Sequence, residues 1–340
     1  MDATTKHTSI TDPAPSDNKS KRRTIPALLR CIAALALVGM LIPLQRSAFP
    51  GNNGFAWALD LFAHWQPWYA ATWLAISALL SSTNRRWLWG LPLAALPWLT
   101  ASQPAAQSQQ PTQLSIVVAN VNIRQHDPQQ LLQWLHRQPA NIVVLTELSP
   151  SYAQQLAAAG NGGFRHTLLH PKDSPPGLGI LSDRPLRQPT LHADALGAFY
   201  LETWFDLHGQ PVRLLAVHPK PPMAVRKFNA RDNLLRELAG SSSGATVMAG
   251  DLNATAWSSA LYAAQQHHLL RVTGTAPTYP SEGVGLIGIG IDHVLVSTHL
   301  TGTFYHRGPD IGSDHLPIRA GIRWQPEQPP ASSPPPEGIE

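Results

Sequence analysis

Three apolar stretches in the first hundred residues constrain the fold of this chain more than any other feature. They cover about residues 25–44, 61–82 and 86–101. A helix needs about 20 apolar residues to cross the hydrocarbon core of a bilayer, with about 17 as a minimum. The first two stretches meet this length, and the third approaches it only if its flanks lie at the interface. We therefore predict an all-α transmembrane anchor of about three helices over residues 25–100.

Two alternatives to an anchor are a buried core helix and, for the first stretch, a cleaved signal peptide. Three successive stretches with tryptophans near their ends favour the anchor, because tryptophan suits the membrane interface. Basic clusters at Lys19–Arg23 and Arg85–Arg86 would lie on the same side if all three stretches cross. The positive-inside rule then predicts a multi-pass protein of a bacterial inner membrane, with everything after Leu99 in the periplasm. A third stretch that does not cross would leave that part in the cytoplasm.

Polar and proline-rich segments separate the anchor from a predicted soluble domain of residues 114–323. We predict a disordered cytoplasmic tail, a short flexible linker and a disordered Pro-rich tail, at residues 1–24, 101–113 and 324–340. The only cysteine, Cys31, excludes an intrachain disulfide.

Positive charge is concentrated in the N-terminal third of the chain. Residues 1–111 have nine Lys/Arg and four Asp/Glu, whereas residues 112–340 have sixteen Lys/Arg and seventeen Asp/Glu. The soluble part therefore lacks the basic surface that proteins use to follow a nucleic-acid backbone. A bound metal ion could still supply local positive charge.

From residue 114 the pattern changes to short β-branched runs with amphipathic segments between them. We predict strands at residues 114–120, 141–146, 179–182, 203–205, 212–217, 245–249 and 294–296. We predict helices at residues 127–137, 150–159, 224–239 and 256–268. Many short strands with interspersed helices indicate an α/β or α+β sandwich.

Polar side chains stand at or just past the ends of the predicted strands. They are Asn120, Glu147, His218, Asp251, Asn253 and Asp292. Each one taken alone could be a turn former or a solvated side chain. Together they could line a cleft, because functional groups gather where strands end in loops. Carboxylate, amide and imidazole groups in one place suit a metal-assisted attack of water on phosphorus.

Seven short motifs strengthen this interpretation. They are Ala119-Asn120-Val121, Leu145-Thr146-Glu147, Gly179-Ile180-Leu181-Ser182-Asp183-Arg184-Pro185, Val217-His218-Pro219, Gly250-Asp251-Leu252-Asn253, Ile291-Asp292-His293 and Ser313-Asp314-His315-Leu316-Pro317. In these motifs and their order, the chain resembles the endonuclease/exonuclease/phosphatase superfamily, including its membrane-anchored bacterial members. The resemblance implies a four-layer α/β (α+β) sandwich, in which two mixed β-sheets pack face to face with helices outside.

The resemblance also implies a metal site. Glu147 looks like the principal ligand of Mg²⁺, a hard cation that prefers carboxylate oxygen, with Mn²⁺ as the alternative metal. Asn120 would orient Glu147 or a bound water, and Asp314 would contribute from the opposite side.

The resemblance implies catalytic roles for five further residues. Asp251 would orient or deprotonate the attacking water, while Asn253 and His218 would donate to phosphoryl oxygens. Asp292 would fix the tautomer of His315 and raise the basicity of its ring. If His315 is protonated, it stabilises the developing charge and Asp251 is the base, which is the assignment that we favour. If His315 is neutral, it can accept the proton itself.

The chain departs from the family pattern at several points. Thr146 stands where a glutamine commonly precedes the glutamate, and only about thirty residues separate Arg184 from His218. This short segment leaves out loops that grip DNA or large head groups in relatives. No tyrosine stands in an obvious position to assist the phosphate.

Our leading prediction is a membrane-tethered, Mg²⁺-dependent phosphoesterase that acts on a phospholipid or lipid-linked phosphate beside the bilayer. The alternative is a periplasmic endonuclease or exonuclease that acts on nucleic acid. A non-catalytic sensor or scaffold on the same fold would be favoured by loss of Glu147, Asp251 or His315, and all three are present.

Overall fold

The computed structural model describes residues 18–48, 53–194, 196–282 and 287–325. The predicted tails at residues 1–24 and 324–340 lie mostly outside the described residues, although helix α1 (Asn18–Leu41) already includes the end of the first tail. The chain divides into two compact units. The smaller unit is Met1–Leu41 with Gln66–Leu99, and the larger unit is Ile42–Trp65 with Thr100–Glu340.

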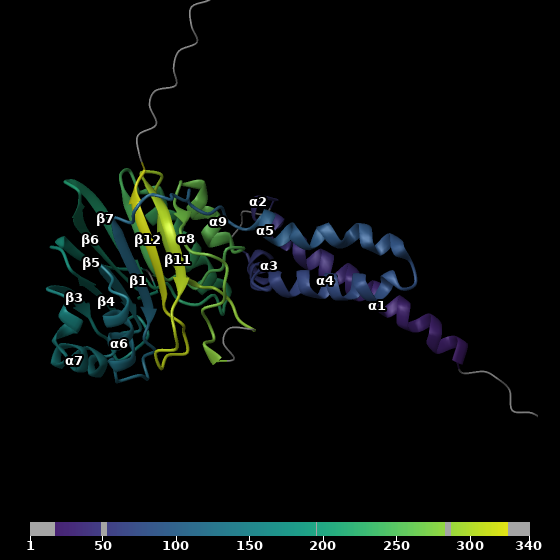
Figure 1. Ribbon diagram of the computed structural model, residues 1–340, viewed down its shortest axis with the longest axis horizontal. Helices are drawn as coiled ribbons and strands as arrows, with labels where there is room; N and C mark the ends of the chain where they lie inside the picture. Colours follow the sequence, from purple (N-terminus) through teal and green to yellow (C-terminus); the bar gives the residue numbers. More distant parts are fainter. Residues whose placement is uncertain (1–17, 49–52, 195, 283–286, 326–340) are drawn as a thin grey trace, which may run out of the picture. The chain divides into compact units, whose positions relative to one another are not determined.

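The larger unit is built on two six-stranded sheets (Figure 1). The first sheet has the order β11 (Leu300–Arg307), β12 (Ile318–Trp324), β1 (Leu114–Asn120), β2 (Ile142–Thr146), β4 (Leu178–Ser182) and β3 (His166–His170). The second sheet has the order β5 (Arg187–Ala193), β6 (Phe199–Leu207), β7 (Gln210–Val217), β8 (Thr246–Asp251), β10 (Asp292–Val296) and β9 (Leu270–Arg271). Both sheets are mixed, because β1 runs parallel to β2 and β7 runs parallel to β8 whereas β12 and β10 join antiparallel.

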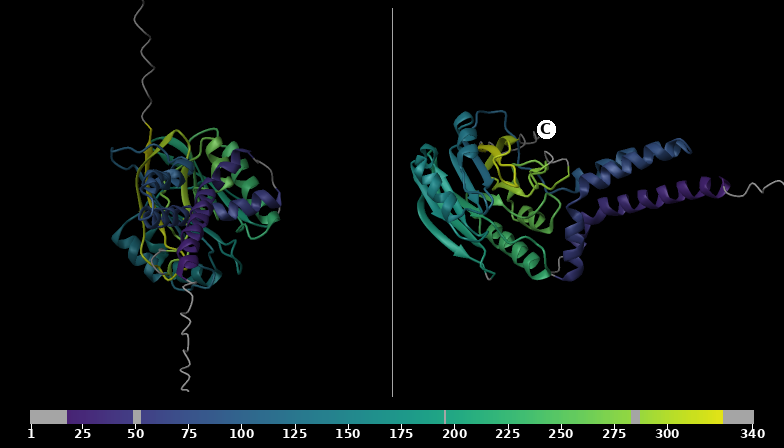
Figure 2. Two further views of the ribbon diagram at one scale, coloured as in Figure 1. Left: turned by 90° about the vertical axis from the view of Figure 1, so that its right-hand side faces the viewer. Right: turned by 90° about the horizontal axis from the view of Figure 1, so that it is seen from below.

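Alternating apolar side chains explain why the sheets stack and why helices cover their outer faces. In β1, Ile116 and Val118 belong to the core between the sheets, whereas Val117 and Ala119 pack under the helices outside. The outer helices are α6 (Gln129–Arg137) and α7 (Pro150–Ala158) on the first sheet, and α8 (Val225–Gly240) and α9 (Ser259–Gln266) on the second (Figures 1 and 2). The predicted sandwich of two mixed sheets with outer helices is confirmed.

Strand register brings the polar strand ends together. In the parallel pair of β1 and β2, Asn120 lies opposite Thr146, so that Glu147 follows directly at the same sheet edge. In the antiparallel pair of β8 and β10, Asp251 lies opposite Asp292. Residues far apart in the sequence therefore meet because backbone pairing fixes their positions.

The segment predicted as a flexible linker is instead packed against the sandwich. Its backbone pairs with two strands, since the amide of Ala105 donates to the carbonyl of Arg271 at 2.6 Å and that of Ser108 to Gly302 at 2.7 Å. Ala105 and Ser102 are buried. These hydrogen bonds hold the segment in place, so it is not a free tether.

The N-terminal region contains fewer long apolar helices than predicted. Its elements are α1, η1 (Ile42–Leu44), α2 (Gln45–Ala48), α3 (Gly54–Ala63), α4 (Gln66–Ser81), η2 (Arg85–Ala95) and α5 (Leu96–Thr100). Among the described residues, only Ala27–Leu44 is long and apolar enough to cross a membrane, and a buried core helix or a signal sequence meets the same criteria. The three-helix anchor is therefore not confirmed.

Two helix breaks account for the difference. The second predicted span is interrupted after Ala63, which leaves α4 with sixteen residues. Most of the third is a 3₁₀ helix with Pro92 inside it, and proline lacks the amide hydrogen that a continuous α-helix requires.

Helix α3 belongs to the larger unit, although the sequence placed most of it in a loop between spans. Its buried residues Ala56, Asp60 and Ala63 follow helical spacing. Asp60 forms a 2.7 Å ion pair with Arg231 of α8, and Nδ1 of His64 lies 2.9 Å from Oγ1 of Thr255. These contacts hold α3 against α8 and against the loop between β8 and α9.

Candidate active site

The strand ends converge on a cavity with a volume of about 780 Å³. Six of the eight predicted site residues line it, namely Glu147, His218, Asp251, Asn253, Asp314 and His315. The other two, Asn120 and Asp292, are buried and contact members of this group. The fold thus brings all eight residues into one neighbourhood.

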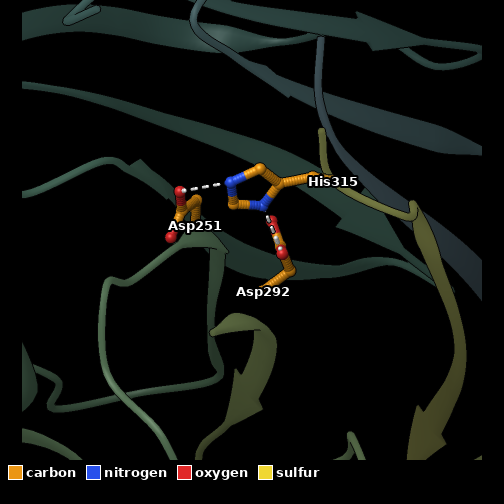
Figure 3. A group of neighbouring side chains, drawn as sticks. All are labelled: Asp251, Asp292 and His315. Carbon is orange, nitrogen blue, oxygen red and sulfur yellow. Dashed lines mark hydrogen bonds and ion pairs between the residues drawn. The ribbon is translucent and has the colours of Figure 1, made fainter. Parts of the chain in front are cut away.

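His315 lies between two buried carboxylates, which Figure 3 shows. Its Nδ1 is 2.9 Å from Oδ2 of Asp292, and its Nε2 is 3.7 Å from Oδ2 of Asp251. Burial alone would lower the pKa of His315, but attraction to Asp292 and Asp251 outweighs it and raises the pKa to about 10. The ring is therefore an imidazolium at neutral pH, with the Asp251 side open toward the cavity.

Asp251 is held ionised by two imidazole rings. Burial would raise its pKa, but His315 and His218 lower it to about 2. The Nε2 of His218 lies 3.5 Å from Oδ2 of Asp251, and this contact raises the pKa of His218 against its own burial. The backbone amide of Asn253 donates to Oδ1 of Asp251 at 2.9 Å. Asp251 is thus a fixed carboxylate with its second oxygen near both rings.

Asn253 sits on the loop after β8 with a positive φ of 49°. Its side-chain amide donates to the carbonyl of Pro219 at 2.9 Å, which leaves one amide hydrogen for another acceptor. The carbonyl of Asn253 accepts a 2.7 Å hydrogen bond from the guanidinium of Arg231. The loop is therefore held from both sides.

Asn120 connects the carboxylate of Asp251 with that of Glu147, the predicted metal ligand. Its amide nitrogen lies 3.1 Å from Oε1 of Glu147 and 3.1 Å from Oδ2 of Asp251. Glu147 also accepts from the amide of Ile123 at 3.1 Å, and its φ is 57°, a conformation that costs energy for a non-glycine residue. These contacts aim the carboxylate of Glu147 into the cavity.

The cavity lining contains carboxylate oxygens, which are the ligand atoms that a hard divalent cation prefers. Glu147 and Asp314 both line the cavity, and Asp314 accepts from Asn122 at 2.8 Å. Among the described residues, one compact group with potential ligand atoms within 4.8 Å is Asp251, Asp292 and His315. That group is a second place where the described residues could hold a cation, because metal binding displaces protons from its ligands.

Two features of the site escaped prediction from the sequence. Tyr279 lines the cavity, and its ring centroid lies 4.8 Å from that of His315. No sequence motif marks this tyrosine, which lies in a loop between strands. Leu61 and Trp65 also line the cavity, from a segment that the sequence assigned to the anchor.

Comparison with known proteins agrees with the motif pattern. A model of the Endonuclease/Exonuclease/phosphatase family matches residues 117–315, more than half of the chain. No curated protein sequence matches the chain.

Several solved structures share the fold at low sequence identity. A humanized D. rerio TDP2 has a TM-score of 0.52 at 17% identity, covering 62% of this chain and 98% of its own. An endonuclease/exonuclease/phosphatase from Beutenbergia cavernae has a TM-score of 0.50 at 18% identity, covering 63% and 72%. Sphingomyelinase C from Streptomyces griseocarneus has a TM-score of 0.50 at 14% identity, covering 62% and 99%. With the family model extending over the site itself, the chain belongs to the endonuclease/exonuclease/phosphatase family.

Proposed function

We propose that this protein is a metal-dependent phosphoesterase in which Asp251 accepts a proton from the attacking water. Members of the family are generally phosphoesterase hydrolases. The observation that carries the proposal is the placement of the His315 ring between Asp292 and Asp251 at one cavity wall. The pKa values of about 10 for His315 and about 2 for Asp251 set an imidazolium beside a carboxylate at neutral pH.

This pairing suits in-line hydrolysis. The carboxylate of Asp251 can take the proton that water loses, and the imidazolium of His315 can stabilise charge on a phosphoryl oxygen. His218 and the remaining amide hydrogen of Asn253 would donate to other phosphoryl oxygens. Asp292 would keep His315 oriented and charged. Each role follows from a group that lines the cavity or contacts one that does.

We assign the metal to Glu147 and Asp314, with Asn120 as the residue that orients Glu147. Oxygen ligands favour Mg²⁺, with Mn²⁺ as the alternative. When bound, the ion would neutralise charge on the phosphate and activate water. Glu147→Ala should abolish the metal-dependent part of turnover while circular dichroism stays unchanged. Unchanged turnover would remove Glu147 from the site.

We further propose that Ala27–Leu44 tethers the protein to a bacterial inner membrane, with the basic residues Lys19–Arg23 on the cytoplasmic side. One crossing would place the sandwich in the periplasm. A phosphatase reporter fused after Gln325 should be active, whereas a fluorescent reporter that matures only in the cytoplasm should be dark. The reverse pattern would overturn this orientation.

The direct test of the proposed function uses the purified full-length protein with Mg²⁺ and two substrates, bis-p-nitrophenyl phosphate and p-nitrophenyl phosphate. Hydrolysis should be lost with a chelator and in the Asp251→Asn and His315→Gln variants. Asp206→Asn is the matched control, because Asp206 is an exposed carboxylate on β6 away from the cavity lining. The preferred substrate would separate diester from monoester chemistry. Equal losses in the control variant would contradict the assignment.

Nucleic acid remains the second candidate substrate because one neighbour, D. rerio TDP2, was solved with a single-strand DNA product. Lys220 and Lys227 on the cavity wall also suit a phosphodiester backbone. The near-neutral charge of residues 112–340 favours a small phosphate ester instead.

A further inference from the structure

One wall of the active-site cavity comes from outside the family domain. Leu61, His64 and Trp65 line the same cavity as Asp251 and His315, although the family model begins only at residue 117. Leu61 belongs to α3, and His64 and Trp65 follow directly after its last residue. This part of the cavity lining therefore lies outside the residues that the family model matches.

Buried polar contacts fix this wall. Asp60 is fully buried and accepts 2.7 Å hydrogen bonds from the Arg231 guanidinium and from the Ser259 amide. Nε1 of Trp57 donates to the carbonyl of Pro222 at 2.8 Å, which ties α3 to the loop after β7. An ion pair that is this deeply buried is costly to break. The wall is therefore part of the folded structure.

The lining of the cavity combines charged residues with a set of apolar ones, which we call the apolar wall. Its contributors are Leu61, Trp65, Phe199, Pro221, Pro222 and Met223. Trp65 is 40% exposed and Met223 is 73% exposed, so that apolar surface remains accessible to solvent. Glu147, Asp251 and His315 line the same cavity. A volume of about 780 Å³ has room for more than a phosphate group.

We propose that this apolar wall binds the hydrocarbon chain of an amphiphilic phosphate ester whose phosphate lies at Asp251, His218 and His315. The inference rests on the proposed function and specifies its substrate class. Lys220 and Lys227 line the cavity as well and complement the negative charge of the phosphate. A cavity whose lining combines charged and apolar side chains matches an amphiphile better than it matches a uniformly polar ester.

The test is a series of alkyl p-nitrophenyl phosphates, from methyl to butyl to hexyl, with the full-length protein in a fixed detergent and Mg²⁺. Each buried methylene contributes about 0.8 kcal/mol, or roughly fourfold, when it leaves water completely. Because a chain at an open wall is only partly buried, we expect kcat/KM to rise on the order of 10- to 100-fold from methyl to hexyl.

The variants Trp65→Ala and Met223→Ala should flatten this rise, because each removes an apolar side chain of the cavity lining that the hydrocarbon chain would contact. Leu191→Ala is the matched control, because Leu191 is a 39% exposed apolar residue on β5 outside the cavity lining. It should keep the full chain-length dependence. A flat series in the wild-type protein, or equal flattening by Leu191→Ala, would overturn the subsite.

Two further measurements separate this inference from the proposed function. Calorimetry with hexyl phosphate and methyl phosphate tests chain binding without turnover, and hexyl phosphate should bind more tightly only when Trp65 and Met223 are present. If the hexyl chain binds but no ester is hydrolysed, the proposed function fails and the subsite stands. If the p-nitrophenyl ester of thymidine monophosphate outperforms the hexyl ester and depends on Trp65, the wall stacks a base instead, and the inference fails.

Discussion

Two buried clusters in the larger unit share one arrangement, a basic side chain between two carboxylates, and differ in their surroundings. One joins Arg231 to Asp60 and Asp232, with both carboxylates 2.7 Å from the same guanidinium nitrogen. The other places His315 between Asp292 and Asp251, at 2.9 Å and 3.7 Å. Each cluster therefore combines one cation with two carboxylates.

The difference lies in the cation and in access to the cavity. Arginine stays charged, and the Ser259 hydroxyl donates to both carboxylates of its cluster. The members of this cluster do not belong to the described cavity lining. Histidine can exchange a proton, and the longer contact of His315 faces the cavity. The same charges therefore hold an element in place in one setting and are available for chemistry in the other.

The sharpest distinction should come from one isosteric change in each cluster. Asp251→Asn should lower kcat by roughly 10²- to 10⁴-fold, because it removes the proposed base while preserving the shape of the side chain. Asp232→Asn should instead lower the free energy of unfolding and leave kcat of the folded protein within a few-fold. Steady-state kinetics and urea unfolding of both variants measure the two effects. Equal losses of kcat in the two variants would contradict a functional difference between the two clusters.

Breaking the arginine cluster should mainly affect stability. Asp60→Ala leaves the charge of Arg231 buried with one partner fewer, and such losses cost about 3–5 kcal/mol. The double variant Asp60→Leu with Arg231→Met should recover part of this loss, because no unpaired charge remains. The exposed pair of Asp183 and Arg184 is the control, and Asp183→Ala should change stability by less than about 1 kcal/mol. Urea unfolding midpoints decide the outcome.

Two buried histidines should make the unfolding free energy depend on pH in opposite directions. Burial lowers the pKa of His293 to about 3, and the nearby charge of Arg271 is the second cause of this shift. The pKa of His315 is instead raised to about 10. The unfolded pKa is about 6.5 for both residues. The contribution of His293 is therefore lost as the pH falls from 6.5 to 3, and that of His315 is lost as the pH rises from 6.5 to 10.

Substitution of each histidine should weaken the pH dependence of the unfolding free energy on one side of pH 6.5, the acid limb for His293 and the alkaline limb for His315. His293→Asn should reduce the slope below pH 6.5, and His315→Gln should reduce the slope above it, each by up to about 1.4 kcal/mol per pH unit. Unfolding free energies measured from pH 4 to 9 test this. An unchanged acid limb in His293→Asn would show that His293 is not held neutral.

The smallest effect is expected at Tyr279, whose ring packs against that of His315. Tyr279→Phe preserves this contact and should change kcat by less than about threefold, whereas Tyr279→Ala exposes the ring of His315 and should cost roughly tenfold. The comparison of the two variants separates ring packing from a role of the hydroxyl. A large loss in Tyr279→Phe would give the hydroxyl a direct part in the reaction.

Local sequence patterns predicted the sandwich because each strand carries its own signature. The β-branched run at 114–120 and the apolar runs at 141–146 and 245–249 depend on neighbouring residues alone, and all three segments form strands. The helices at 127–137 and 224–239 begin and end within two residues of α6 and α8. Segments whose environment is set by distant residues were harder to predict. The stretch at 101–113 appeared polar and free, yet it pairs with Arg271 and Gly302.

The sequence by itself determined which side chains could carry chemistry, because Glu147, Asp251 and His315 sit in short motifs at strand ends. Only the tertiary structure decided that Leu61 and Trp65 share a cavity with them. The sequence of an apolar helix looks the same whether the helix packs against lipid or against protein, because both environments remove its side chains from water. What distinguishes α3 is the ion pair of Asp60 with Arg231, a contact across 171 residues of sequence that no local pattern encodes.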